Sequence, residues 1–282
     1  MKRNIFFATA MALCMGLSFT SCLDSDNDTD TNYVGGFVKV SSSYMGFGSF
    51  ISPDGKTTIN PSTASLTNLE QNGFKMSEVN AAFVQGTYSE AENPDAATTL
   101  KFNNVSISYA ASLDARVEIV DQKGALNDSI NRACIRNIDN SQRGNNYFSE
   151  DFNKPWFFYD NTTLVLPISY NLSGQKLHAF TLVFYASEVE PGDTTLKLSL
   201  KHYNANENAS NNDSYSFAAN YPYAYFYAFD LRNAIAYWQR TNSGSAEPQT
   251  VTIEYVASEF SNDIKQGETK QLTIERKGIV QK

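Results

Sequence analysis

The sequence predicts an all-β fold, with a small barrel in the first half of the chain and an antiparallel β-sandwich in the second. β-Branched and aromatic residues alternate with polar ones in short runs, and clusters of Asn, Asp, Ser and Gly separate these runs. Apolar residues rarely recur at the helical period. The pattern therefore lacks the crossover helices that a helix-covered parallel sheet requires.

Residues 1–21 lie outside the predicted fold and are typical of a bacterial signal peptide. Lys2 and Arg3 form a charged start, and residues 5–19 are mostly apolar or small. This run is shorter than the about 20 apolar residues that a membrane-spanning helix needs. The end of the run resembles a lipobox, which implies cleavage before Cys22 and acylation of its thiol, as with palmitate. The alternative is an ordinary secretory signal that is cut elsewhere.

Residues 22–32 are acidic and almost devoid of apolar side chains, so we expect a disordered tether. Thr29 and Gly35 stand where a calcium-binding loop needs its turn glycine and its bidentate glutamate, which argues against calcium. An acidic run directly after the lipidated cysteine instead resembles the surface-export signal of Bacteroidetes lipoproteins. This resemblance implies an outer-membrane anchor with the body facing outward. The acidic residues of the run are Asp24, Asp26, Asp28 and Asp30.

The charge and the cysteines exclude two classes of protein. The 282 residues carry a formal net charge of −8, and loss of Lys2 and Arg3 with the signal leaves 20 basic against 30 acidic residues, or −10. Such a chain does not suit nucleic acid, which is bound through clustered Lys and Arg. With Cys22 acylated, only Cys134 is left in the mature chain, so no intramolecular disulfide forms. We expect Cys134 to be a small buried residue in a strand.

Residues 33–121 are predicted to form the barrel domain. Pro53-Asp54-Gly55 is a turn between the second and third strands. Five or six short strands within about 90 residues suit an OB-like barrel. From Gln122 the chain becomes polar and rich in Asn, which places the domain boundary there. The predicted strands are 36–40, 47–51, 56–59, 79–88, 100–109 and 116–120.

Residues 122–282 are predicted to form the sandwich. Large residues alternate along 164–172, and Pro167 places that strand at an edge or a bulge because proline cannot donate to a ladder. The apolar run 177–185 is typical of a central strand. Leucines alternate with Lys and Ser along 196–201, which indicates one dry face and one wet face.

Several segments in this order resemble one family, the NigD-like lipoproteins of Bacteroides and relatives. The resemblance implies an N-terminal OB-type domain and a C-terminal β-sandwich over most of the mature chain. It implies no catalytic residue, and the family's name, taken from a bacteriocin locus, hints at a role in competition or self-protection. The segments are the lipobox with its acidic run, Phe50 to Pro61, Trp156 ahead of 164–171, His178 to Val183, and Leu198 to Asn204.

No motif of known chemistry is present. The two histidines, His178 and His202, have no cysteine or carboxylate at ligand spacing, so we expect strand histidines rather than a metal site. The chain contains no G-x-S-x-G, H-E-x-x-H, Walker or G-x-G-x-x-G pattern. The sequence therefore predicts no catalytic residue, metal or cofactor.

One aromatic segment favours ligand binding. Four tyrosines share one face of a predicted strand, where their rings would stack on a sugar or on a partner protein. The alternative is that this row closes the sandwich core, with its hydroxyl groups at the rim. The four residues are Tyr221, Tyr223, Tyr225 and Tyr227.

Two short segments resemble the Asp-Ser/Thr-apolar or Asp-Ser/Thr-Thr sequon of Bacteroides O-glycosylation. They are Asp128-Ser129-Ile130 and Asp193-Thr194-Thr195, and both lie in expected turns. Ser129 and Thr194 are therefore candidate acceptors.

These patterns predict a lipoprotein that is anchored in the outer membrane and exposed on the cell surface. We expect a non-catalytic binding module for a glycan or protein ligand, with no nucleic-acid partner. The alternative is a hydrolase that acts on exported polymers such as polysaccharides. A hydrolase would need two carboxylates in one cleft with an aromatic wall, drawn from Asp160, Glu188, Glu190 and Asp230.

Overall fold

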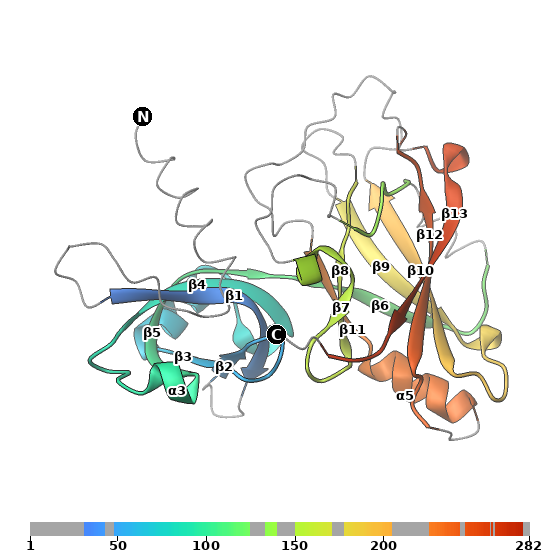
Figure 1. Cartoon of the computed structure of the whole chain (residues 1–282). Helices are drawn as coiled ribbons and strands as arrows, with labels where there is room; N and C mark the ends of the chain where they lie inside the picture. The colour runs from blue at the N-terminus through green and yellow to red at the C-terminus, as the bar shows by residue number, and fades with distance from the viewer. Residues whose placement is uncertain are drawn as a thin grey trace.

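The computed structural model is all-β and comprises a closed barrel followed by an eight-stranded sheet that curls over its own core (Figure 1). The predicted fold class is therefore confirmed. Within the residues that the structure describes, no helix is both long and apolar enough to cross a membrane. The signal peptide, Cys22 and the four aspartates of the acidic run lie outside these residues. Thr31 and Asn32, predicted as the end of the disordered tether, instead form the start of a strand that pairs with residues 88–89. The described residues are 31–42, 48–124, 133–139, 150–170, 178–204, 226–242, 246–259, 261 and 263–278.

The first unit is a five-stranded barrel with the strand order β1-β2-β3-β5-β4. β1 pairs antiparallel with β2 and β4, while β3 and β5 run parallel. A closed barrel of five strands agrees with the OB-like barrel that the sequence predicts, although β1 and β5 are longer than expected. Its strands are β1 (Thr31–Ser42), β2 (Gly48–Ile51), β3 (Thr58–Pro61), β4 (Ala81–Ser89) and β5 (Lys101–Ser112).

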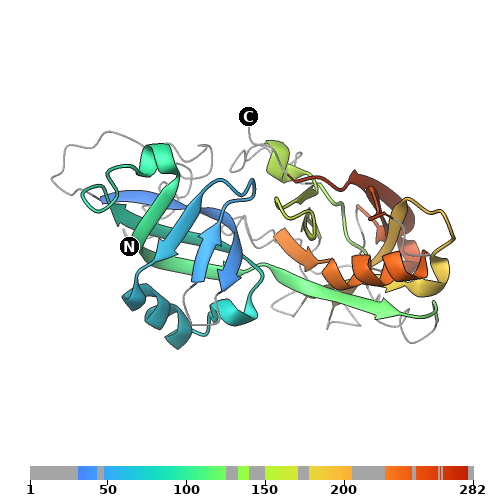
Figure 2. The same cartoon turned by 90° about the horizontal axis from the view of Figure 1, so that it is seen from below.

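A helix that the sequence pattern does not predict closes one end of the barrel. α2 (Thr63–Gln71) begins after Ser62, whose side chain accepts a hydrogen bond of 3.2 Å from the Ser65 backbone N–H. Leu69 packs into the barrel core. Figure 2 shows α2 at one end of the barrel and the short helix α3 (Ala96–Thr99) at the other. The apolar face of α2 has few leucines, so the helical period of apolar residues is weak in the sequence. The capping residue Ser62 was the one sequence feature that indicated the start of a helix. The single turn η1 (Met76–Glu78) follows α2.

The second unit is one mixed sheet with the strand order β13-β12-β10-β9-β6-β11-β8-β7. The helix α5 (Arg232–Thr241) connects β11 to β12. Short turns η3 (Glu150–Asn153), η4 (Ala186–Glu188) and η6 (Ile264–Gln266) complete the unit. Its strands are β6 (Asp114–Val120), β7 (Trp156–Phe157), β8 (Thr163–Pro167), β9 (His178–Tyr185), β10 (Thr195–Asn204), β11 (Phe226–Asp230), β12 (Thr250–Ala257) and β13 (Glu268–Glu275).

β6 lies in the second sheet, whereas the sequence analysis placed the strand at 116–120 in the barrel. Residues 114–115 pair with β11, and residues 116–120 pair with β9. β6 therefore leaves the barrel directly after β5 and joins the two halves of the sheet (Figure 1). An alternating strand has the same pattern in either sheet, so the pattern could not assign it.

The strand directions also differ from the antiparallel pairing that we expected. Of the seven neighbouring pairs in the second sheet, β10–β12, β6–β9 and β6–β11 are parallel. Parallel neighbours need long connections rather than tight turns, and side-chain alternation carries no information about direction.

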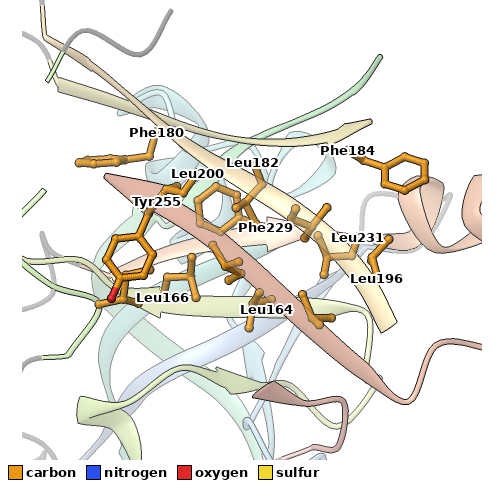
Figure 3. Close-up of a cluster of buried hydrophobic side chains, with 14 of the residues drawn as sticks. Leu164, Leu166, Phe180, Leu182, Phe184, Leu196, Leu200, Phe229, Leu231 and Tyr255 are labelled. Carbon is orange, nitrogen blue, oxygen red and sulfur yellow. The ribbon is translucent and has the colours of Figure 1, made fainter. Parts of the chain in front are cut away.

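The core of the second unit lies inside the curl of the sheet. Figure 3 shows side chains of β8, β9 and β10 pointing into one cluster. Trp238 of α5 belongs to the same cluster. The dry face predicted for residues 196–200 is therefore confirmed. The predicted wet face is wrong beyond Lys197, because Ser199 and Lys201 are also buried. Members that are 3% exposed or less include Leu164, Leu166, Phe180, Leu182, Leu196 and Leu200.

The two units meet across an aromatic cluster, which we call the seam. Phe37 of β1 lies at its centre, with its ring centroid 4.7 Å from that of Phe226 and 5.7 Å from that of Trp156. A backbone hydrogen bond of 2.8 Å from Tyr159 to Pro53 also joins the units. The buried members of the seam are Phe37, Ala81, Phe83, Leu113, Trp156, Phe158, Val165, Phe226 and Ala228.

Candidate functional site

Tyr227 is the one member of the predicted tyrosine row that the structure describes, since Tyr221, Tyr223 and Tyr225 lie outside the described residues. Its ring packs 4.4 Å from that of Phe180, and its hydroxyl oxygen lies 2.9 Å from that of Tyr170. The neighbouring Phe226 and Ala228 point into the seam. Both faces of β11 are therefore packed at Tyr227. This packing agrees with the alternative in which the tyrosine row closes the sandwich core.

The two histidines lie diagonally across β9 and β10, because His178 pairs with Asn204 and His202 pairs with Phe180. His178 Nδ1 lies 2.8 Å from His202 Nε2, and His202 Nδ1 lies 3.0 Å from the carbonyl oxygen of Cys134. A carbonyl oxygen can only accept, so His202 carries its proton on Nδ1 and its Nε2 accepts the proton of His178 Nδ1. This geometry fixes one tautomer for both rings.

Burial holds this pair neutral. Burial of the ring, together with the nearby His178, lowers the pKa of His202 to about 3. Burial also lowers the pKa of His178. Among the described residues, no group of three or more His, Cys, Asp or Glu side chains could hold a metal ion. The pair therefore resembles core histidines rather than a proton-transfer site.

Cys134 is buried, and its Sγ lies 3.2 Å from the carbonyl oxygen of Asp263. Burial raises the pKa of its thiol to about 11, and the charge of Asp263 adds to this shift. Because the thiolate is the reactive form, this cysteine is inert at neutral pH. The expected burial is confirmed, but Cys134 lies between isolated bridges at Ala133 and Ile135 rather than in a strand.

Two of the four candidate carboxylates come together where the units meet. β8 pairs with β11 so that Thr163 lies opposite Asp230. Asp160 accepts a hydrogen bond of 3.1 Å from the Thr163 backbone N–H. Lys39 of the barrel forms an ion pair with Asp160 and donates to the Thr163 hydroxyl. We call Lys39, Asp160, Thr163, Asp230 and Arg232 the junction cluster.

The other two carboxylates lie away from this cluster. Glu188 is at the end of η4, 3.8 Å from Lys123 Nζ. Glu190 lies in the turn before β10, where its backbone N–H donates to the Asp193 carboxylate at 3.1 Å. Neither residue supplies a second acid to the junction cluster.

Each carboxylate of the junction cluster is already bound to a cation. Burial would raise the pKa of Asp160, but the hydrogen bond and charge of Lys39 outweigh it, so this pKa is lowered. Burial would also raise the pKa of Asp230, but the hydrogen bonds and charge of Arg232 outweigh it, so this pKa is lowered as well. Asp114 nearby has a raised pKa because of its burial, and both of its oxygens accept backbone N–H groups, from Asn80 and Ala81. Asp160 and Asp114 thus form bonds between the two units, whereas Asp230 pairs with Arg232 within the second unit.

Replacing Lys39 by Met is expected to lower the free energy of unfolding by about 1–3 kcal/mol, because Asp160 and Thr163 lose their partner in a largely buried place. Urea unfolding measures this change. Lys56→Met is the control, since Lys56 is 58% exposed in its pair with Asp54 and should cost less than about 0.5 kcal/mol. Equal midpoints for the two variants would contradict a stabilising role for the junction cluster.

Sequence reasoning found Asp160 and Asp230 but missed Lys39 and Thr163. These residues are 124 positions apart and meet only because the two units dock. No local pattern marks them. The predicted glycan acceptor Thr194 is exposed, directly before β10, while Ser129 lies outside the described residues.

No family model matches the chain, and no curated protein matches it in sequence. Solved structures do match. A candidate lipoprotein from Bacteroides fragilis aligns with a TM-score of 0.65 and 20% identity, over 87% of this chain and 98% of that one. The two proteins share one fold. Because the alignment spans almost all of that protein, the shared fold includes both the barrel and the curled sheet.

Two further solved structures come from the same genus. A protein of unknown function from Bacteroides vulgatus is 12% identical, with a TM-score of 0.48 over 86% of this chain and 90% of that one. A NigD-like immunity protein from Bacteroides caccae is 15% identical, with a TM-score of 0.42 over 85% of this chain and 90% of that one. A NigD-like protein is thus among the structural neighbours.

Proposed function

We propose that this protein is an outer-membrane-anchored lipoprotein, exposed on the cell surface, that acts as a non-catalytic binding module for a glycan or protein ligand. The carrying observation is that a lipobox ending at Cys22 precedes a two-unit β body with the fold of a candidate lipoprotein from Bacteroides. The acidic run at Asp24, Asp26, Asp28 and Asp30 supplies the export signal in this proposal.

The state of the titratable groups favours binding over catalysis. A general acid or base must reach the substrate with the correct protonation state. Asp160 and Asp230 are instead bound to Lys39 and Arg232, and burial keeps His202 neutral. A hydrolase acting on exported polymers is the second candidate, because these two carboxylates do share one junction. Their bound cations make it the weaker one.

Replacing Cys22 by Ala is expected to move the protein from the outer-membrane fraction to the soluble fraction. The acyl chains hold the protein through about 0.8 kcal/mol per buried methylene, and the variant has no thiol to acylate. Fractionation with an acyl label measures both effects. Cys134→Ala is the matched control, because Cys134 is 1% exposed in the folded body and should keep its anchor. Recovery of Cys22→Ala in the membrane with an unchanged label would overturn the proposed anchor.

Surface display would also expose the proposed glycan acceptors to modification. Thr194 fits this role because it is exposed and lies just after the turn at Pro191 and Gly192. Ser129 is proposed on its sequence pattern alone. A glycan at either position would be a large, solvated group on the outside of the body.

A further inference from the structure

A row of uncharged hydrogen-bonding side chains crosses the outer face of the barrel. Ser41 lies opposite Ser49 in the β1–β2 register. Ser49 Oγ donates to Asn60 Oδ1 at 2.7 Å, and Asn60 Nδ2 donates to Asn103 Oδ1 at 2.8 Å. The row, which we call the amide row, therefore spans β1, β2, β3 and β5.

Strand alternation places this row on the outside. Phe50, Ile59 and Phe102 are neighbours of the row on β2, β3 and β5, and they are 0%, 1% and 4% exposed in the barrel core. Because successive side chains of a strand point to opposite faces, Ser49, Asn60 and Asn103 point outward. Ser41 and Asn103, at the two ends of the row, are exposed.

The second unit leaves this face open. It docks through the seam onto β1 and β4, where Phe37 and Phe83 lie, and it also contacts Lys39 of β1 and Pro53 in the turn between β2 and β3. Figure 2 shows β2 and β3 at the front of the barrel, with α2 and α3 at its two ends rather than over these strands. Among the described residues, the row is therefore exposed at its two ends, Ser41 and Asn103, and partly exposed at Ser49 and Asn60.

Hydrogen bonds along the row order its side chains before a ligand arrives. Asn60 is held from both sides, and the backbone N–H of Asn103 donates to Asn93 Oδ1 at 2.7 Å. Side chains that are already ordered lose less conformational entropy on binding. One proton of the Asn60 amide and both protons of the Asn103 amide stay outside these bonds.

The spacing and charge of the row indicate the class of ligand. Neighbouring strands lie about 4.8 Å apart, so the row repeats at roughly the length of one sugar unit in an extended polysaccharide. Each position offers a hydroxyl or amide group, which suits a sugar hydroxyl as donor and as acceptor. The row itself carries no charge, in a chain of net charge −8, which matches a neutral ligand and disfavours a polyanion.

We propose that the amide row binds a neutral, hydroxyl-rich polysaccharide. This inference rests on the proposed binding function and specifies its ligand class and its surface. The probes are beads that carry amylose, cellulose or mannan, with polygalacturonate beads as the anionic comparison. The lipidated protein, extracted in detergent, should be retained on at least one neutral polysaccharide and released by the same polysaccharide in solution.

Variants of the row test its role. Asn60→Ala/Asn103→Ala should weaken retention at least tenfold. Asn68→Ala/Asn233→Ala, which changes two exposed asparagines on α2 and α5, should leave it unchanged. Ser41→Arg is a second test that keeps every hydrogen bond of the row and adds a bulky charge at its exposed end. It should also weaken retention at least tenfold, whether or not the double variant folds.

The outcomes separate this inference from the proposed function. If the parent and the row variants were retained equally, the amide row would not be the binding surface. The proposal that the protein binds a glycan would still stand. No retention of the parent on any neutral polysaccharide would overturn the ligand class. Surface display, which is measured separately on intact cells, would be unaffected by either result.

Discussion

Replacing Phe37 by Ala is expected to lower the free energy of unfolding by about 3–5 kcal/mol, the range for removing a large buried aromatic side chain. Phe37 is 4% exposed, and its ring contacts those of Phe83, Phe152, Trp156 and Phe226. These contacts join the barrel to the second sheet. The loss should therefore appear in the coupling of the units as well as in the total stability.

Chemical denaturation followed by tryptophan fluorescence and by circular dichroism measures both effects. The parent should unfold in one transition by both probes, and Phe37→Ala should separate the transitions of the two units. Tyr33→Ala on the same strand is the control, because Tyr33 is 69% exposed and should cost less than about 0.5 kcal/mol. A single unshifted transition for Phe37→Ala would contradict a cooperative seam.

Acidification is expected to destabilise the protein between about pH 6.5 and pH 4. An unfolded histidine takes up a proton below about pH 6.5, but folded His202 takes one up only near pH 3. The unfolded state therefore binds more protons in this range, and stability falls as pH falls, by up to about 1.4 kcal/mol per pH unit for this residue. The lowered pKa of His178 acts in the same direction.

The carboxylates change the stability of the fold at lower pH than the histidines do, or in the opposite direction. Asp160 has a lowered pKa, so its contribution is lost only below about pH 4. Asp114 has a raised pKa, so the folded state takes up its proton first, which offsets part of the histidine effect.

Urea unfolding at half-unit pH steps measures the slope of stability against pH. His202→Phe keeps an aromatic ring next to Phe180 and removes one titrating group, so its slope between pH 6.5 and pH 4 should fall by up to about 1.4 kcal/mol per pH unit. The slope reports the titration separately from any loss of stability in the variant. An unchanged slope in His202→Phe would show that the buried histidine does not control acid sensitivity.

The strands could be predicted from the sequence because alternation is local. The leucines at 164, 166, 196, 198 and 200 alternate with their neighbours, and all of them are buried in the second core. The partner of a strand is not local. β6 therefore looked like a barrel strand, although it pairs with β9 and β11. The parallel pairs were missed for the same reason.

The candidate sites could be predicted less well, because they depend on contacts between distant segments. His178 and His202 were recognised as strand residues, but their direct hydrogen bond appears only when β9 and β10 pair. The junction cluster and the amide row each need residues from separate strands, and neither leaves a motif in the chain. Asn60 and Asn103 are 43 positions apart.

The most direct test of the account is labelling of lysines on intact cells with a membrane-impermeant amine reagent. Lys56, Lys75 and Lys277 have side chains that are 58%, 56% and 76% exposed, so a body on the cell surface offers them to the reagent. We predict equal labelling in intact and lysed cells for the parent. A variant with Asp24, Asp26, Asp28 and Asp30 replaced by Ala should label only after lysis. Labelling of the parent only after lysis would contradict surface display.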